Sequence, residues 1–279
     1  MENERWKIAA FYHFTELEDR DAWADRMVDH GLKVGLRGTL IFAPEGVNST
    51  CSGSEEAIDA TIALLKSDPR FATLEVKYSF ADFNPFPKFK VKKKPEIVTF
   101  RQEGADPRDS VGTYLEPEEW NEIIQDPDVI TIDTRNDYEV KVGQFKGAIN
   151  PKTDDFTEFA KFVDAHLASQ KDKKIAMYCT GGIRCERSTA YLKKKGFKDV
   201  YHLKGGILRY LETMPKGESL WEGDCFVFDY RVAVDHDLQP AKWKIDPATS
   251  LPEPMNDDEI DKISERRRSG AIFKKPYTV

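Results

Sequence analysis

The stretch Lys174–Leu192, KIAMYCTGGIRCERSTAYL, has the pattern of a buried strand, a glycine-rich loop and a helix. The apolar run Ile175–Tyr178 predicts a short strand, and helical spacing begins near Cys185. Cys179 ends the strand, and the loop after it consists of Thr180, Gly181, Gly182, Ile183 and Arg184. Backbone N–H groups and a helix N-terminus favour a thiolate, the form that attacks electrophiles or carries sulfur. We interpret Cys179 as a catalytic thiol and Arg184 as a fixed cation; the alternative is a buried structural cysteine.

Strands and helices alternate on both sides of this stretch. The predicted strands are Val129–Ile132, Ile175–Tyr178 and Val200–Leu203, and the predicted helices begin at Pro117, Phe156, Cys185 and Ile207. This alternation is typical of an α/β domain with a parallel sheet and helices on both faces. Sites in such sheets lie at the carboxyl ends of the strands, where both Asp133 and Cys179 are expected.

Residues near these strand ends are candidates for supporting roles. Asp133 is interpreted as a loop organiser, and Arg135 either pairs with Asp137 or Glu139 to hold the loop or contacts the substrate. Cys185 is either a small core residue or a resolving thiol that forms a transient disulfide with Cys179. The remaining candidates, interpreted as packed residues, are Cys51, Cys225 and His202.

The first half of the chain has a different order of elements. The pattern predicts strands over 6–12, 34–42, 47–51 and 71–80, and helices over 19–30 and 54–65. Gly31 is the expected C-cap of the first helix and Ser54 the expected N-cap of the second. The order βαββαβ is the ferredoxin-like plan, an antiparallel sheet with two helices on one face.

A basic segment joins the two halves over residues 83–95. It contains Lys88, Lys90, Lys92, Lys93 and Lys94, with Phe86 and Phe89 among them. Pro85, Pro87 and Pro95 exclude regular structure at their own positions. The segment is either a solvated linker or an RNA contact in which lysines hold phosphates and aromatic rings stack on bases.

The composition is that of a folded soluble protein of about two domains. The 279 residues are 40% hydrophobic, and 42 basic against 49 acidic side chains give a net charge of −7. This balance argues against bulk nucleic-acid binding but is compatible with a local basic patch. The sequence contains no apolar run long enough for a membrane span and no signal-peptide pattern at its start, so we expect a cytoplasmic protein without membrane association.

The sequence does not indicate a cofactor. Four cysteines without a Cys-x-x-Cys pair predict neither a disulfide framework nor a metal site, and they suit a reducing compartment. Flavin and dinucleotide fingerprints are also absent from the sequence.

Several motifs resemble the rhodanese superfamily. CTGGIR at Cys179–Arg184 resembles its active-site loop, and Asp133-Thr134-Arg135 resembles its first signature. GQFKGAIN at Gly143–Asn150 resembles its G-H-I-x-G-A-x-N segment, with Gln144 where His is usual, and Val200–Gly206 resembles its last strand and turn. The loop has the length found in sulfurtransferases, whereas related dual-specificity phosphatases have a longer one, and this disfavours a phosphatase.

A narrower resemblance covers about Trp6 to Val234. LIFAPEGVNST at Leu40–Thr50 is similar to the L-A-P-E-G-I-N-G-T segment of tRNA uridine hydroxylases that carry a rhodanese domain, with Ser49 where Gly is usual. CTGGIRCE at Cys179–Glu186 and FVFDYRV at Phe226–Val232 resemble the same family. Many of its members have a cysteine-rich tail, but residues 235–279 contain no cysteine.

The resemblance implies hydroxylation of C5 of the wobble uridine of tRNA, with molecular oxygen as co-substrate and Cys179 as the essential thiol. The implied partners are tRNA and a sulfur or electron donor. The alternatives are a sulfurtransferase that carries sulfane sulfur as a Cys179 persulfide, and a non-enzymatic RNA-binding module. The corresponding domain boundaries are 1–100 (ferredoxin-like), 101–113 (linker), 114–218 (rhodanese) and 219–279 (C-terminal extension).

Overall fold

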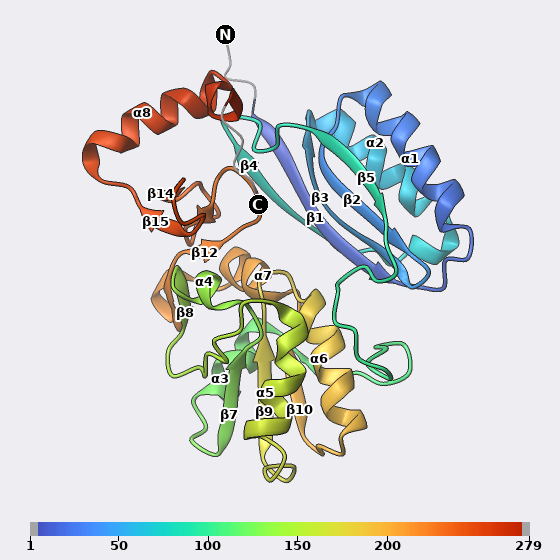
Figure 1. Cartoon of the computed structure of the whole chain (residues 1–279), viewed down its shortest axis with the longest axis vertical. Helices are drawn as coiled ribbons and strands as arrows, with labels where there is room; N and C mark the ends of the chain where they lie inside the picture. The colour runs from blue at the N-terminus through green and yellow to red at the C-terminus, as the bar shows by residue number, and fades with distance from the viewer. Residues whose placement is uncertain (1–4, 275–279) are drawn as a thin grey trace. The chain divides into compact units, whose positions relative to one another are not determined.

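The computed structural model describes residues 5–274, and their contacts divide the chain into two compact units (Figure 1). Unit 1 contains residues 5–97, 228–233 and 239–274, and unit 2 contains residues 98–227 and 234–238. The residues after 227 are therefore shared between the units instead of forming a body of their own.

Unit 1 has the predicted ferredoxin-like plan with one additional strand. Its sheet has the order β4-β1-β3-β2-β5, and helices α1 and α2 cover one face (Figure 1). The elements are β1 (Trp6–Phe14), α1 (Arg20–Val34), β2 (Arg37–Ala43), β3 (Gly46–Gly53), α2 (Glu55–Lys66), η1 (Pro69–Phe71), β4 (Val76–Ala81) and β5 (Phe89–Lys93). Ser54 caps α2 as predicted, accepting a hydrogen bond from the backbone N–H of Ala57 at 3.2 Å.

The first helix is longer than the sequence predicts. Gly31 was the expected C-cap, but α1 continues to Val34, and Gly35 ends it in the left-handed conformation with φ of 75°. Gly31 has another role, because a Cβ there would lie 2.2 Å from the ring of Phe89. This glycine lets β5 pack closely against the helix.

The basic segment contains regular structure that its prolines obscured. Phe89–Lys93 forms β5 and pairs in parallel with β2 at the edge of the sheet. Pro87 and Pro95 flank this strand and do not interrupt it. Phe89 and Val91 alternate with the lysines and pack against the core between the sheet and the helices.

Unit 2 has the predicted parallel sheet, with the order β6-β10-β9-β7. Its two faces bear separate hydrophobic clusters, one containing Ile175 and Met177 and the other Ala176 and Tyr178. The strands are β6 (Thr113–Leu115), β7 (Val129–Asp133), β8 (Gly143–Phe145), β9 (Lys174–Tyr178), β10 (Val200–Leu203), β11 (Trp221–Gly223) and β12 (Cys225–Phe226). The helices are α3 (Pro117–Ile124), α4 (Asp137–Val140), η2 (Phe156–Glu158), α5 (Phe159–His166), α6 (Ile183–Lys194), α7 (Gly206–Thr213) and η3 (Lys216–Glu218).

The segment 101–113, expected to be a linker, packs along α6. Gly112 donates its backbone N–H to Thr189 Oγ1 at 3.0 Å, and Arg187 donates to the carbonyl of Ala105 at 2.9 Å. These contacts explain why polar residues of α6, among them Arg187 and Thr189, are buried.

The C-terminal residues add β13 (Ala233–Val234), β14 (Trp243–Ile245), β15 (Pro252–Pro254), α8 (Asp257–Arg268) and η4 (Ala271–Lys274). The charged helix over 257–268 was predicted, and Asn256 caps it. Arg267 is buried and donates to the carbonyl of Trp243 at 2.9 Å. Within residues 5–274, no helix has the length and hydrophobicity needed to span a membrane.

Candidate active site

Cys179 follows β9, an interior strand of the unit 2 sheet, and precedes the first turn of α6. Gly182 has φ of 100° and donates its backbone N–H to Cys179 Sγ at 3.1 Å. That conformation favours glycine, because an L side chain there would strain the backbone. The thiol is 1% exposed, so the loop closes tightly around the sulfur.

The surroundings of Cys179 stabilise its ionised form. Burial alone would raise the pKa of this thiol, since a charge is poorly solvated in the interior. The hydrogen bond with Cys185, the positive charge of Arg184 and the backbone N–H groups of Cys185 and Arg184 act in the opposite direction and prevail. They lower the pKa of Cys179 to about 5, so the sulfur is a thiolate at neutral pH.

Cys185 is the neutral partner of this thiolate. Its Sγ lies 3.7 Å from Thr134 Oγ1, whose hydroxyl donates to the carbonyl of Tyr178 at 3.0 Å. Because Cys185 keeps its proton, its S–H is the donor in the hydrogen bond with the Cys179 sulfur. Burial and the neighbouring Cys179 charge raise the pKa of Cys185 well above its usual range. Both cysteines are free, and Cys185 is at once a core residue and a contact of the Cys179 sulfur.

Arg184 is held by a carboxylate that the sequence did not single out for it. Its two terminal nitrogens lie 2.6 and 2.8 Å from the two oxygens of Glu139, and it also donates to Thr180 Oγ1 at 3.3 Å. Glu139 is fully buried on α4 and also accepts the backbone N–H of Asn136 at 3.1 Å. Burial opposes its ionisation, but Arg184 lowers the pKa of Glu139, so the pair is charged on both sides.

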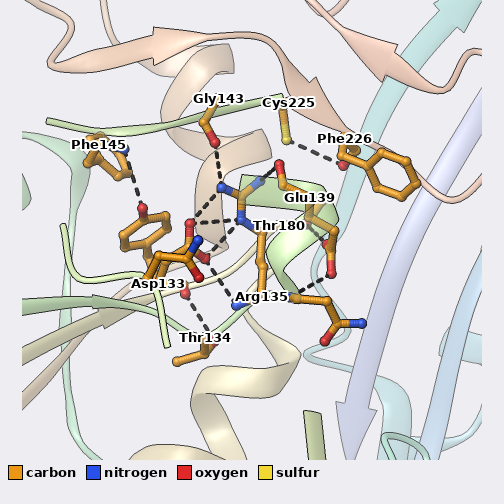
Figure 2. Close-up of polar contacts among 12 residues, drawn as sticks. Asp133, Thr134, Arg135, Glu139, Gly143, Phe145, Thr180, Cys225 and Phe226 are labelled. Atoms are coloured by element: carbon orange, nitrogen blue, oxygen red, sulfur yellow. Dashed lines mark hydrogen bonds and ion pairs between the residues drawn. The ribbon is translucent and has the colours of Figure 1, made fainter. Parts of the chain in front are cut away.

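Arg135 pairs with Asp133, and the expected carboxylate partners Asp137 and Glu139 do not hold it. Its Nε and one terminal nitrogen donate to Asp133 at 2.9 and 2.6 Å, and the same terminal nitrogen donates to the carbonyl of Gly143 at 2.6 Å (Figure 2). Another donor reaches the backbone carbonyl of Glu139 at 3.3 Å. Both side chains of the pair are fully buried. Asp133 thus anchors Arg135, and the fully buried Arg135 holds together the loops after β7.

The turn at Gly206, where α7 begins, also holds the loop of Cys179 in place. The first amides of α7 donate to carbonyls of this loop: Ile207 N–H to the carbonyl of Cys179 and Leu208 N–H to that of Thr180, each at 3.0 Å. A Cβ on Gly206 would lie 2.5 Å from the Cys179 carbonyl oxygen and 2.7 Å from the Gly182 nitrogen. Gly181 differs, since a Cβ there would meet no described atom within 4 Å.

The basic segment lies in unit 1, while Cys179 lies in unit 2. Lys88, Lys90, Lys92 and Lys93 are exposed and Lys94 is half-buried. Phe89 packs against the core and Phe86 packs beside Ile8 and Phe83, so both rings that the RNA-contact alternative assigned to stacking are partly buried. Lys93 is 3.0 Å from Asp25 of α1.

The other candidates are packed residues, as expected. Burial raises the pKa values of Cys51 and Cys225 to about 12, so both are neutral thiols. His202 is 1% exposed, and burial lowers its pKa to about 4, so it is uncharged at neutral pH. Among residues 5–274, no three His, Cys, Asp or Glu side chains gather in a way that could hold a metal ion.

This arrangement surrounds the buried Cys179 thiolate with backbone amides, and the neighbouring cation, Arg184, is held in position by Glu139. Such a sulfur can act as a nucleophile or carry a sulfane sulfur. Sequence reasoning missed Glu139 as the partner of Arg184, and it missed the contacts of Thr134 and Gly206. The signal was present for Gly206 alone, since a Gly-Gly pair after a strand indicates a tight backbone approach.

Two family models match the chain, one on each half. The UPF0176 acylphosphatase like domain matches residues 6–97, and the Rhodanese-like domain matches residues 116–213. The solved structures similar to the chain include the rhodanese-like domain of the Anabaena sp. Alr3790 protein, with 20% identity over 40% of this chain and 80% of its own and a TM-score of 0.33. A rhodanese-related protein from Thermoplasma volcanium has 22% identity over 37% of this chain and 93% of its own, with a TM-score of 0.31.

The combination of the two domain models is more informative than either alone. The first matches the segment that contains LIFAPEGVNST, and the second matches the segment that contains Cys179 and its loop. These are the two regions whose motifs predicted the family. The chain therefore has the two-domain architecture of the rhodanese-domain UPF0176 family.

Proposed function

We propose that this protein hydroxylates C5 of the wobble uridine of tRNA, with molecular oxygen as co-substrate and with Cys179 as the essential thiol. The observation that carries the proposal is the Cys179 thiolate, whose pKa of about 5 results from the loop amides, Cys185 and Arg184 despite its burial. The joint presence of the two family domains connects this thiolate with the tRNA hydroxylases that the sequence resembles.

The overall reaction balances as follows. One oxygen atom of O₂ enters the C5–H bond of uracil and the other leaves as water, which requires two electrons and two protons. A cellular thiol or persulfide reductant is the proposed source of the electron pair. On the protein, Cys179 provides the reactive sulfur, and Arg184 with the loop amides stabilises its negative charge.

A sulfurtransferase is the second candidate, and the loop geometry supports it as well. The Gly182 N–H at 3.1 Å from Cys179 Sγ would equally stabilise a persulfide, which a thiolate forms when it accepts sulfane sulfur. Under this alternative Cys179 takes sulfur from thiosulfate or a persulfide donor and passes it to a thiol or cyanide.

One experiment separates the two candidates. Purified protein is incubated with tRNA and a dithiol reductant, in air and without oxygen, and the nucleosides are analysed by mass spectrometry. Hydroxylation predicts 5-hydroxyuridine only in air and only with intact Cys179. Thiosulfate-to-cyanide sulfur transfer without any change in tRNA would reject hydroxylation and establish the alternative.

A further inference from the structure

Cys185 directs two hydrogen-bond donors at the Cys179 sulfur. Its S–H donates to Cys179 Sγ, and its backbone N–H donates to the same atom. Both donors belong to the first turn of α6, which follows the loop of Cys179 directly. The two sulfurs are therefore in contact, and a disulfide requires them to approach further, to about 2.05 Å.

The loop between the two cysteines has room at one position. Gly181 is half-buried, and a Cβ there would meet no described atom within 4 Å. Cys185 is fully buried, in the hydrophobic cluster that also contains Ile132 and Met177. A small oxidant or a thiol reductant that enters beside Gly181 thus meets Cys179, and Cys185 reacts with the group that forms there.

The charge of Cys179 keeps Cys185 protonated while the pair is reduced. Burial, the hydrogen bond to Cys179 and its negative charge raise the pKa of Cys185, whereas Thr134 and Arg184 act in the opposite direction. Oxidation of Cys179 removes that negative charge, while Arg184 stays in place because Glu139 holds it at 2.6 Å. Cys185 therefore becomes easier to ionise once Cys179 is oxidised, and the thiolate is the form that attacks an oxidised sulfur.

A packing role alone is the alternative, because free cysteines are among the most buried residues in proteins. Cys225 is an example within unit 2. It is fully buried, and its S–H donates to the carbonyl of Phe226 at 3.7 Å. Burial is the main reason that the pKa of Cys225 is raised, and the charge of Cys179 adds to it. Cys185 differs from Cys225 because its S–H is placed on the thiolate itself.

We propose that Cys185 is the resolving thiol of Cys179, so that oxidation of Cys179 ends in a disulfide between the two residues. With hydrogen peroxide, the Cys179 sulfur bonds to one oxygen atom as the O–O bond breaks, which gives a sulfenic acid and hydroxide. The Cys185 sulfur then attacks the Cys179 sulfur, the S–S bond forms and the S–O bond breaks. The departing oxygen takes the Cys185 proton and leaves as water, and the two sulfurs have lost two electrons in total.

Under the proposed function, the two sulfurs are the immediate donors of the electron pair. Hydroxylation requires two electrons for each O₂, and joining two thiols in a disulfide releases two. The cellular reductant then restores the dithiol by thiol–disulfide exchange. This use of the electrons rests on the proposed function, whereas the disulfide itself does not.

The disulfide is tested first without tRNA. Full-length protein is reduced, freed of reductant without oxygen and treated with one equivalent of hydrogen peroxide, and the remaining thiols are alkylated. Trypsin cleaves after Lys174, Arg184 and Arg187, so the disulfide must link peptide 175–184 to peptide 185–187. The wild type should lose two of its four free thiols and yield this linked pair, and dithiothreitol should restore both thiols.

Cys185→Ser is the informative variant, because it keeps a hydrogen-bond donor beside Cys179 but cannot form the disulfide. It should lose one thiol, and its Cys179 sulfenic acid should react with dimedone. Cys225→Ser is the matched control at another buried cysteine of unit 2, and it should yield the linked pair as the wild type does. Thermal unfolding of both variants checks the fold. In the wild type, a sulfenic acid on Cys179 beside an alkylated Cys185 would overturn the inference and leave Cys185 as a packing residue.

A single turnover then distinguishes the dithiol from the proposed function. Reduced protein without added reductant is given tRNA and air, and 5-hydroxyuridine is measured together with the linked peptides. In the wild type the two products should appear in equal amounts, whereas Cys185→Ser should form no 5-hydroxyuridine until a dithiol is added. Linked peptides with peroxide but no 5-hydroxyuridine in any condition would mean that the dithiol stands and the proposed function fails. In the wild type, 5-hydroxyuridine without linked peptides would show that Cys185 does not supply the electrons.

Discussion

Arg184 and Glu139 form a two-pronged ion pair, at 2.6 and 2.8 Å, that joins the loop of Cys179 to helix α4. The carboxylate is fully buried and the guanidinium nearly so. The cation that stabilises the Cys179 thiolate therefore has a fixed position before any substrate arrives, which is the form of electrostatic stabilisation that costs least during a reaction.

Breaking this pair should destabilise unit 2 strongly. Glu139→Gln leaves Arg184 buried without its countercharge, and we expect a loss of about 3–5 kcal/mol in the free energy of unfolding, measured with urea. The control Glu118→Gln changes an exposed glutamate of α3 and should stay within about 0.5 kcal/mol of the wild type. Equal stability of the two variants would show that the ion pair does not hold the loop.

The Cys179 thiol should titrate near pH 5. Its folded-state pKa lies below that of an ordinary thiol, so ionisation stabilises the fold above the ordinary pKa, and this contribution is lost as the pH falls through about 5. The ultraviolet absorbance of the thiolate, taken as wild type minus Cys179→Ser, should show the transition. A midpoint near the ordinary value of about 8.5 would contradict the assigned charge state.

Cys185 should control that midpoint through its S–H. Cys185→Ala removes the hydrogen-bond donor to the Cys179 sulfur and should raise the pKa of Cys179, whereas Cys185→Ser keeps a donor and should raise it less. The same absorbance titration measures both variants. If the alanine variant titrates like the wild type, the contact between the two sulfurs has no electrostatic role.

Gly206 should be essential for the geometry of the loop. A Cβ there would meet the Cys179 carbonyl at 2.5 Å, and the residue has φ of 68°, so Gly206→Ala must displace the loop. We expect a large loss of activity and a higher pKa of Cys179. Gly217→Ala is the control, because a Cβ at Gly217 meets no described atom within 4 Å. Matching activities of the two variants would mean that α7 does not position the loop.

The sequence predicted most elements, and it predicted the position of Cys179 between a strand and a helix, because these signals are local. The strand, loop and helix around Cys179 follow from an apolar run, two glycines and helical spacing within one short stretch. The sequence did not predict that Arg135 pairs with Asp133 and Arg184 with Glu139. Both arginines have acidic residues available, and only the packing of the folded chain decides which carboxylate each one meets. Strand β5 was missed for a similar reason, because its flanking prolines were visible but the pairing with β2 joins distant parts of the chain.

The most direct test of the central claim compares tRNA nucleosides from cells. The strains lack the gene or carry it back as wild type, Cys179→Ser or Cys51→Ser, the last being a control at a buried thiol of unit 1. We predict that 5-hydroxyuridine derivatives disappear on deletion and return with the wild type and Cys51→Ser but not with Cys179→Ser. Their return with Cys179→Ser, or unchanged nucleosides in the deletion strain, would contradict the account.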